Sequence, residues 1–310
     1  MPADAEILAR LRGRIAAIER DGSGIRAQDC AGSLPLGIPE IDSHLPWGGL
    51  VTGAVHEFLG ENIRKTEQFI EKQLRDKTHI KYEVGVSGAV TAFAAALAGK
   101  AQKARAAPVI WIAPRLTERE SLYGPGLLEY GLDPAELIVV RIPTGAEFTP
   151  TALWALEEAL RAPSVGLVCA EIEDMDLTAS RRLQLAAEAG GGLGLLLRPP
   201  PLISVQNALP PTASVTRWRV SSLPGSPAEE AWTPERLPGR PRWRAELLRA
   251  RGGRPRAWNL EWRDDRTNDD ERGAKAGGFA LVSPLRDRPV PQTIATGFTT
   301  IRETRHSHSA

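Results

Sequence analysis

The sequence predicts an α/β fold built on a mostly parallel, twisted sheet. Between residues 84 and 198, short apolar runs alternate with amphipathic segments, and the apolar runs are continuous, which is typical of parallel strands covered on both faces. After Arg198, four segments instead alternate apolar and polar residues, which indicates half-exposed strands. We therefore expect a doubly wound core flanked by helices, extended by C-terminal antiparallel strands without a second core.

Composition places the chain among ordinary globular proteins. Its 310 residues are 42% hydrophobic and 25% charged. No apolar run approaches the roughly 20 residues needed to span a bilayer, and the N-terminus lacks the apolar region of a signal peptide, so we expect a cytoplasmic protein without membrane contact. The net charge of +1 hides an excess of arginine between Arg217 and Arg266. Any anion-binding face should therefore lie in the C-terminal third.

The chain has two cysteines, Cys30 and Cys169, which lie far apart in the sequence. Cys169 is inside an apolar run, which favours a buried thiol over a disulfide or a metal ligand. His306 and His308 lie in a polar C-terminal segment and are interpreted as solvent-exposed residues. We therefore predict no metal site.

The predicted elements follow in chain order. Residues 1–33 should form an amphipathic helix, with Ile7, Leu11 and Ile18 on its apolar face, and a linker. The stretch from Leu34 to Gly60 predicts a loop, a helical turn, a Gly-Gly corner and a buried strand. The remaining predicted helices are 89–98, 118–130, 151–161 and 177–189, and the parallel strands are 109–113, 137–142, 165–170 and 193–197.

The C-terminal part is predicted to contain half-exposed strands that carry tryptophans. These antiparallel strands lie within residues 214–283, at 214–220, 243–249, 257–262 and 279–282, with Trp218, Trp243, Trp258 and Trp262 in or beside them. Residues 264–275 are charged and predict a loop. Residues 286–310 are polar with little periodicity and predict a disordered tail.

The stretch from Leu34 to Gly60 also carries a resemblance to a known family. Its Gly37, Ile41-Asp42, Leu45, Gly48-Gly49-Leu50, Gly53, Glu57 and Gly60 resemble the entry to the ATPase core of RecA-type recombinases. The similarity continues, more weakly in the second half, to residue 262. It implies a RecA-like domain over residues 34–285, in which 248–251 looks like the strand where recombinases place basic residues facing the next subunit.

The residues that would bind nucleotide phosphates do not fit that family. A phosphate loop needs glycines, a lysine and a Ser or Thr hydroxyl for magnesium. After Gly60, the matching helix begins Gly88-Ala89-Val90-Thr91, with Ala89 at the lysine position and Val90 at the hydroxyl position. Thr91 could be shifted into register, but no shift supplies an adjacent lysine. The loop is therefore degenerate, and residues 62–84 are interpreted as a helix and strand inserted into it.

An alternative phosphate site begins at Gly60 itself. Residues 60–66 resemble the phosphate-loop pattern through Lys65 and Thr66, but the second glycine is missing and the loop is one residue short. An active ATPase that uses Lys65 and Thr66 in a remodelled loop is thus a rival hypothesis.

The other catalytic positions are replaced as well. RecA-type ATPases place an acidic base after the second core strand, where this chain has Pro114 and Arg115. They place a magnesium-directing Asp at the end of the third strand, where this chain has Ala170 followed by Glu171. Glu171 could hold a metal if the register slips by one, or it is a solvent-facing carboxylate at a strand end. We predict a nucleotide-binding fold without catalytic residues, in which ATP binding without hydrolysis stays open.

Further blocks resemble one family of RecA relatives. Residues 176–188 followed by glycines and LGLLLRP, the block PRWRAELLRARGGRPRAWNLEW and the block GFALVSPLRDRP are similar to the ImuA family, RecA-like accessory proteins of bacterial SOS mutagenesis. The resemblance implies a role in error-prone translesion synthesis at the nucleoid. It implies an inactive Y-family polymerase homologue of the ImuB type and an error-prone C-family polymerase as partners, and RecA and DNA as possible ones. A SulA-like cell-division inhibitor is a further alternative, which the length and the arginine-rich C-terminal half disfavour.

Two groups of arginines are candidates for binding DNA or a partner. Arg181 and Arg182 begin a helix near the expected first DNA loop, where they could hold a phosphate or form a solvated pair. Residues 199–212, in the position of the second loop, contain no basic or aromatic residue to hold a single strand. The second group should lie on one strand face and could bind a nucleic-acid backbone or an acidic partner. Its members are Arg242, Arg244, Arg249 and Arg251.

Overall fold

A computed structural model describes residues 32–60, 86–115, 122–173, 175–199, 210–225, 240–263 and 277–282. The predicted N-terminal helix, the predicted 62–84 insertion, the charged 264–275 segment and the predicted 286–310 tail lie outside the described residues. In the described part, no helix is both long enough and apolar enough to cross a membrane.

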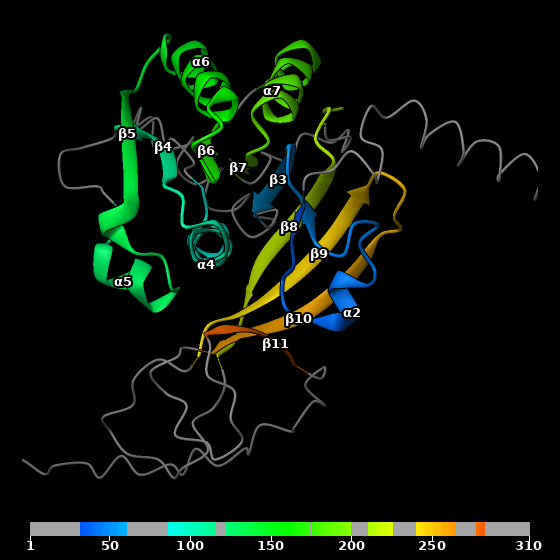
Figure 1. Cartoon of the computed structure of the whole chain (residues 1–310). Coiled ribbons are helices and arrows are strands. Elements are labelled where there is room, and N and C mark those ends of the chain that lie inside the picture. Colours follow the sequence, from blue (N-terminus) through cyan, green and yellow to red (C-terminus); the bar gives the residue numbers. More distant parts are fainter. Residues whose placement is uncertain are drawn as a thin grey trace, which may run out of the picture.

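A nine-stranded sheet forms the centre of the structure (Figure 1). The strands run in the order β11-β10-β9-β8-β3-β7-β6-β4-β5. In this spatial order, the strands from β8 to β5 pair in parallel, and β9, β10 and β11 add antiparallel pairs. Their bounds are β3 (Ala54–Gly60), β4 (Val109–Arg115), β5 (Leu137–Pro143), β6 (Leu167–Glu171), β7 (Leu193–Arg198), β8 (Thr216–Leu223), β9 (Arg242–Ala250), β10 (Arg256–Arg263) and β11 (Gly278–Leu281).

This architecture confirms the predicted fold class, and it is consistent with a RecA-like fold. One direction within the predicted antiparallel extension was wrong, because β8 pairs in parallel with β3 and only its other edge pairs antiparallel, with β9. The chain between β7 and β8 explains the difference. Residues 199–215 are long enough for the crossover connection that a parallel strand requires.

Helices cover the sheet on both faces. The helices α6 (Phe148–Arg161) and α7 (Leu177–Gly190) lie side by side at the top of Figure 1 and pack on β3, β4, β5 and β6. The other face carries α4 (Gly88–Arg105), with α5 (Gly124–Glu129) beside it. Three short elements complete the described fold: α2 (Pro39–Asp42), the 3₁₀ turn η2 (Pro134–Glu136) and a two-stranded sheet of β1 (Ser33–Leu34) and β2 (Leu50–Val51).

The stretch before β3 folds as predicted into a loop, a helical turn and a glycine corner. The Asp42 carboxylate accepts hydrogen bonds from the backbone N–H groups of Leu36 (2.7 Å) and Gly37 (2.9 Å), which closes the loop onto α2. At the corner, a Cβ on Gly49 would lie 2.5 Å from the carbonyl oxygen of Leu34. Only glycine fits this approach, so β1 and β2 depend on it.

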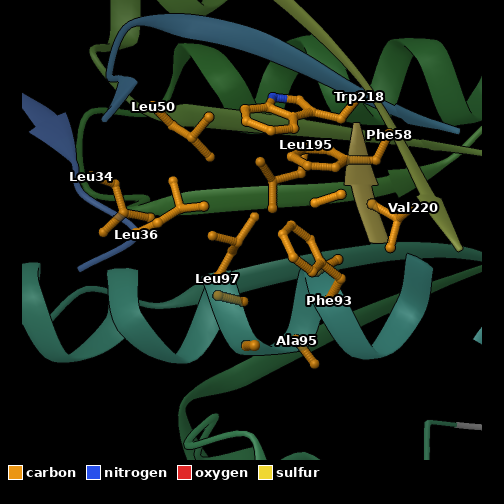
Figure 2. Packing of buried hydrophobic residues seen from close by; sticks show 14 of the residues in the cluster. Leu34, Leu36, Leu50, Phe58, Phe93, Ala95, Leu97, Leu195, Trp218 and Val220 are labelled. Carbon is orange, nitrogen blue, oxygen red and sulfur yellow. The ribbon is translucent and has the colours of Figure 1, made fainter. Parts of the chain in front are cut away.

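Two apolar layers hold the helices to the sheet. The larger lies between the sheet and α4, where Phe93 and Leu97 of the helix meet Phe58 and Trp218 of the strands (Figure 2). Phe58 and Trp218 stack with ring centroids 6.3 Å apart. The second layer lies under α6 and α7. All four predicted strand tryptophans are buried on the α4 side, and so is Cys169, which confirms the predicted buried thiol.

Candidate functional site

The residues predicted at the nucleotide position flank the end of β3 and the start of α4. Gly60 is the buried last residue of β3, and Gly88 is the first residue of α4. The segment between them, with the alternative Lys65 and Thr66, lies outside the described residues. The described part of the site is therefore the first turn of α4 and the ends of the neighbouring strands.

The first turn of α4 is occupied by the chain's own side chains. Ser87 caps the helix, because its hydroxyl oxygen accepts a hydrogen bond from the N–H of Val90 (3.4 Å). The Thr91 hydroxyl donates to the Ser87 carbonyl (3.3 Å). Val90 is fully buried and Ala89 packs against the same apolar layer. The first turn of α4, where a phosphate would bind, is therefore capped by Ser87 and lined by apolar side chains.

Glu171, the candidate metal-directing carboxylate, is the last residue of β6. Its Oε1 accepts a hydrogen bond from the indole Nε1–H of Trp111, 2.9 Å away on β4. Burial raises the pKa of Glu171, although the hydrogen bond from Trp111 works in the other direction. In the described part of the chain, no group of three or more His, Cys, Asp or Glu is placed to hold a metal ion. A magnesium role for Glu171 would need ligands from elsewhere.

Pro114 and Arg115, at the position of the catalytic base, extend β4 beyond its predicted end. They pair with Ile142 and Pro143 of β5. Neither side chain can take a proton from water at neutral pH. The three described positions where chemistry would occur are thus used for strand pairing, packing and helix capping.

A buried ionic cluster lies on the face of the sheet opposite α4, where β3 runs between β7 and β8. Glu57 of β3 is fully buried and accepts hydrogen bonds from Arg198 Nη1 (2.8 Å), Arg217 Nε (2.5 Å) and Thr212 Oγ1 (3.0 Å). Arg198 also donates to the Glu173 carbonyl, and Arg217 to the Pro210 carbonyl. The Glu57 carboxylate thereby connects the middle of β3 with the end of β7, the start of β8 and the segment that enters β8.

Arg249 and Arg251 hold the same segment through its backbone carbonyl groups. Arg249 Nη2 donates to the carbonyl oxygens of Ser214 (2.6 Å) and Thr212 (3.2 Å), and Arg251 Nη2 donates to that of Ala213 (2.7 Å). Burial, followed by the positive charges of Arg217 and Arg251, lowers the pKa of Arg249. These two candidate arginines therefore anchor backbone within this chain.

Arg242 and Arg244 each pair with a glutamate, Arg242 with a buried one and Arg244 with a partly exposed one. Arg242 forms an ion pair with Glu261 of β10 (2.6 Å), and Arg244 donates through Nε to Glu246 (2.8 Å). A β-bulge between the pairs Arg217/Arg249 and Trp218/Leu247 adds one residue to β9. Because of this extra residue, Arg249 shares the face of Arg244 although the two are five residues apart.

The two predicted arginines of α7 are exposed. Arg182 forms an ion pair with Glu157 of α6 (2.5 Å), so it contributes to the contact between the two helices. Arg181 lies next to it on the exposed side. Arg182 is therefore paired within the layer of α6 and α7. Of the four arginines predicted on the strand face, Arg249 and Arg251 anchor backbone, whereas Arg242 and Arg244 pair with glutamates.

Comparison with known proteins identifies the family. No protein-family model matches the chain. Two curated proteins are similar to it, both named Protein ImuA, from Caulobacter vibrioides strains NA1000 / CB15N and ATCC 19089 / CIP 103742 / CB 15. Each is 36% identical over 261 residues, which is 83% of this chain and 91% of the relative.

The chain belongs to the ImuA family.

Within this ImuA-family chain, sequence reasoning missed the roles of Ser87 and Glu57. Ser87 precedes the helix at the capping position, which is a readable signal. Glu57, with His56, is a polar residue in an otherwise apolar strand, and such a residue must have a buried partner. Its partners are 141 and 160 residues away, so the sequence could indicate a buried ion pair but could not identify it.

Proposed function

We propose that the chain is a non-catalytic RecA-like adaptor in SOS-induced, error-prone translesion DNA synthesis. It would assemble a mutagenic complex with an inactive Y-family polymerase homologue of the ImuB type and an error-prone C-family polymerase, at the nucleoid in the cytoplasm. Membership in the ImuA family supports the pathway. The proposal that the chain is non-catalytic rests on the first turn of α4.

In that turn, the position of the phosphate-binding lysine is Ala89 and that of the magnesium-binding hydroxyl is the buried Val90. Ser87 already satisfies the N–H of Val90. A phosphate would have to displace this cap and would meet apolar side chains. This arrangement favours a scaffold that binds proteins over an enzyme that hydrolyses ATP.

An adaptor needs exposed contact surfaces, and the β5 end of the structure offers one. β5 is the last strand of the sheet, and its Ile138 and Val139 are 51% and 39% exposed. The neighbouring α6 exposes 63% of Trp154. Tryptophan is enriched at the energetic centres of protein interfaces, so this end is the proposed contact for a polymerase partner.

Co-purification with the Y-family homologue tests the adaptor role. We expect the wild-type chain to retain the partner and the Trp154→Ala chain to lose most of it, while Glu40→Gln, an exposed change on α2 away from β5 and α6, retains it. Failure of the wild-type chain to bind would contradict the proposal.

An ATPase assay on the purified chain tests the non-catalytic part separately. We expect no hydrolysis above the background without protein. Hydrolysis that Lys65→Ala abolishes would establish the rival active ATPase instead.

A further inference from the structure

The two faces of β8, β9 and β10 differ sharply in composition. Trp218, Trp243, Trp258 and Trp262 all point to the α4 side, where they are buried. The alternate residues on the opposite face are mostly polar and rich in arginine, with Leu223 and Ala257 as apolar exceptions. We call this opposite face the arginine face; its members are Arg219, Arg242, Arg244, Glu246, Asn259, Glu261 and Arg263.

The helices on this side of the sheet lie over other strands. α6 packs on β4, β5 and β6, and α7 packs on β3. In Figure 1, β8, β9 and β10 extend away from both helices. Several side chains of the arginine face are accordingly open to solvent: those of Arg244 and Arg263 are 51% and 52% exposed, and that of Arg219 is 32% exposed.

Each glutamate of the arginine face is shared by more than one guanidinium. Glu246 accepts from Arg244 Nε (2.8 Å) and Arg219 Nη1 (3.2 Å). Burial works to raise the pKa of Glu246, but Arg244 and Arg219 outweigh it and lower that pKa. Glu246 therefore stays ionised. In the described part of the chain, each of its two arginines donates to it through one nitrogen, and a guanidinium carries further N–H groups.

Glu261 is shared in the same way. It pairs with Arg242 at 2.6 Å, and a nitrogen of Arg263 lies 3.7 Å from its other carboxylate oxygen. Arg240, just before β9, also lies 3.7 Å from Glu261. Positive charge thus exceeds negative charge at both glutamates, and the face as a whole attracts anions.

The side chains of the arginine face indicate which anion fits. Its described members include no aromatic residue, so bases would have no ring to stack on. A protein partner would likewise find no aromatic anchor of the kind that dominates protein interfaces. Nucleic-acid interfaces, by contrast, are polar and positively charged, and phosphate contacts supply most of their sequence-independent affinity.

We propose that the arginine face binds the sugar-phosphate backbone of DNA without reading its sequence. Guanidinium groups on neighbouring strands would contact successive phosphates, and Glu246 and Glu261 would hold them in place and limit the affinity. DNA binding by the purified chain can be measured without a polymerase partner. A negative result would therefore leave the proposed adaptor function unaffected.

Fluorescence anisotropy with labelled single-stranded and double-stranded oligonucleotides of mixed sequence tests the inference. We expect the full-length chain to bind, with an affinity that falls steeply between about 50 and 200 mM salt. In the double variant Arg219→Gln/Arg244→Gln, the slope of log affinity against log salt should fall by about two. Arg141→Gln, on the distant β5, is the matched control and should leave the slope unchanged.

Glu246→Gln gives a test with the opposite sign. Removing the competing carboxylate frees both arginines, so DNA binding should tighten and the salt slope should rise by about one. A purely structural role for Glu246 predicts no tightening. If the double variant loses its fold by circular dichroism, the single exposed change Arg263→Gln, with an expected slope change of about one, takes its place.

The inference is wrong if the wild-type chain binds neither oligonucleotide at about 50 mM salt. It is also wrong if the double variant binds DNA as the wild type does, because another surface then carries the binding. A labelled glutamate-rich peptide serves as the third probe. Binding of this peptide without binding of DNA would assign the arginine face to an acidic protein.

Discussion

The parallel half of the sheet and its antiparallel half use their second face in opposite ways. Strands β3, β6 and β7 are buried almost throughout, between α4 on one side and α6 and α7 on the other. Strands β9 and β10 bury tryptophans on the α4 side only and carry arginines on the other. In the first half, the described start of α4 is capped and apolar, whereas the second half keeps charged groups accessible for contacts.

The boundary between the two halves is the cluster around Glu57. It joins β3, β7 and β8 and holds Thr212 of the entering segment. Changes there should affect the whole sheet, while changes on the arginine face should be almost silent in stability. The following predictions test this difference.

The largest effect is expected from Glu57→Ala. It leaves Arg198 and Arg217 buried without their shared carboxylate, which should cost about 3–5 kcal/mol in the free energy of unfolding. Urea unfolding followed by circular dichroism measures it. Glu246→Ala is the matched control, because Glu246 also holds two arginines but at the surface, and should cost at most about 1 kcal/mol. Equal losses in the free energy of unfolding for the two variants would show that the parallel and antiparallel halves of the sheet do not differ in this way.

Acid should destabilise the sheet through His56. This fully buried residue accepts at Nδ1 from Thr216 Oγ1 (2.7 Å) and donates from Nε2 to the Val51 carbonyl (2.9 Å), which is the arrangement of a neutral imidazole. Burial, opposed by the Val51 bond, lowers the pKa of His56 from 6.5 to about 4.

Because the unfolded chain binds the proton more readily, stability is complete above pH 6.5 and decreases as the pH falls towards about 4. The total loss should approach about 3 kcal/mol. Urea midpoints across this pH range measure it. The loss should persist in His44→Gln, which changes a partly exposed histidine, and should shrink in His56→Gln. A flat profile in the wild type would contradict the buried neutral histidine.

A smaller effect is expected from Val90→Thr, which restores the hydroxyl of a phosphate loop. The change places a polar group in the apolar layer under α4 and should cost about 1–2 kcal/mol, with no gain in ATP hydrolysis. Thermal unfolding with and without magnesium and ATP provides the measurement. Thr91→Val is the control, since it removes only a partly exposed hydroxyl at the next position. A rise in melting temperature with ATP in Val90→Thr would show that the site is still open to nucleotide.

The smallest effect is expected from Arg244→Gln. The side chain is 51% exposed and its ion pair with Glu246 lies at the surface, so the free energy of unfolding should change by less than about 0.5 kcal/mol. Chemical unfolding measures it. A loss comparable to that of Glu57→Ala would mean that the arginine face is part of the folding core.

Much of the fold could be predicted because its signals are local. Continuous apolar runs and period-two alternation predicted every strand of the main sheet, and Gly48-Gly49 predicted the corner before β2. The boundaries were less exact: α4 continues to Arg105, where the alanine-rich stretch still favours a helix. The direction of β8 could not be predicted from its own residues, since it depends on pairing with β3.

The candidate site was predicted less completely because its contacts are long-range. The replaced positions Ala89 and Val90 were evident from the motif, but the partners of Arg249 and Arg251 are backbone carbonyls more than 30 residues away. The prediction that the four arginines share a face is geometrically right only through the bulge in β9. Strict alternation would have placed Arg244 and Arg249 on opposite faces.

That bulge has a consequence for how chains of this kind can vary in length. One additional residue between the pairs at Trp218 and Arg217 decides whether Arg249 of β9, and Arg251 just after the strand, meet backbone carbonyls or the tryptophan layer. Removing Leu248 would therefore rotate Arg249 into an apolar layer, although composition and charge would hardly change. In an alignment of relatives, we expect the number of residues in this strand to vary less than their identity.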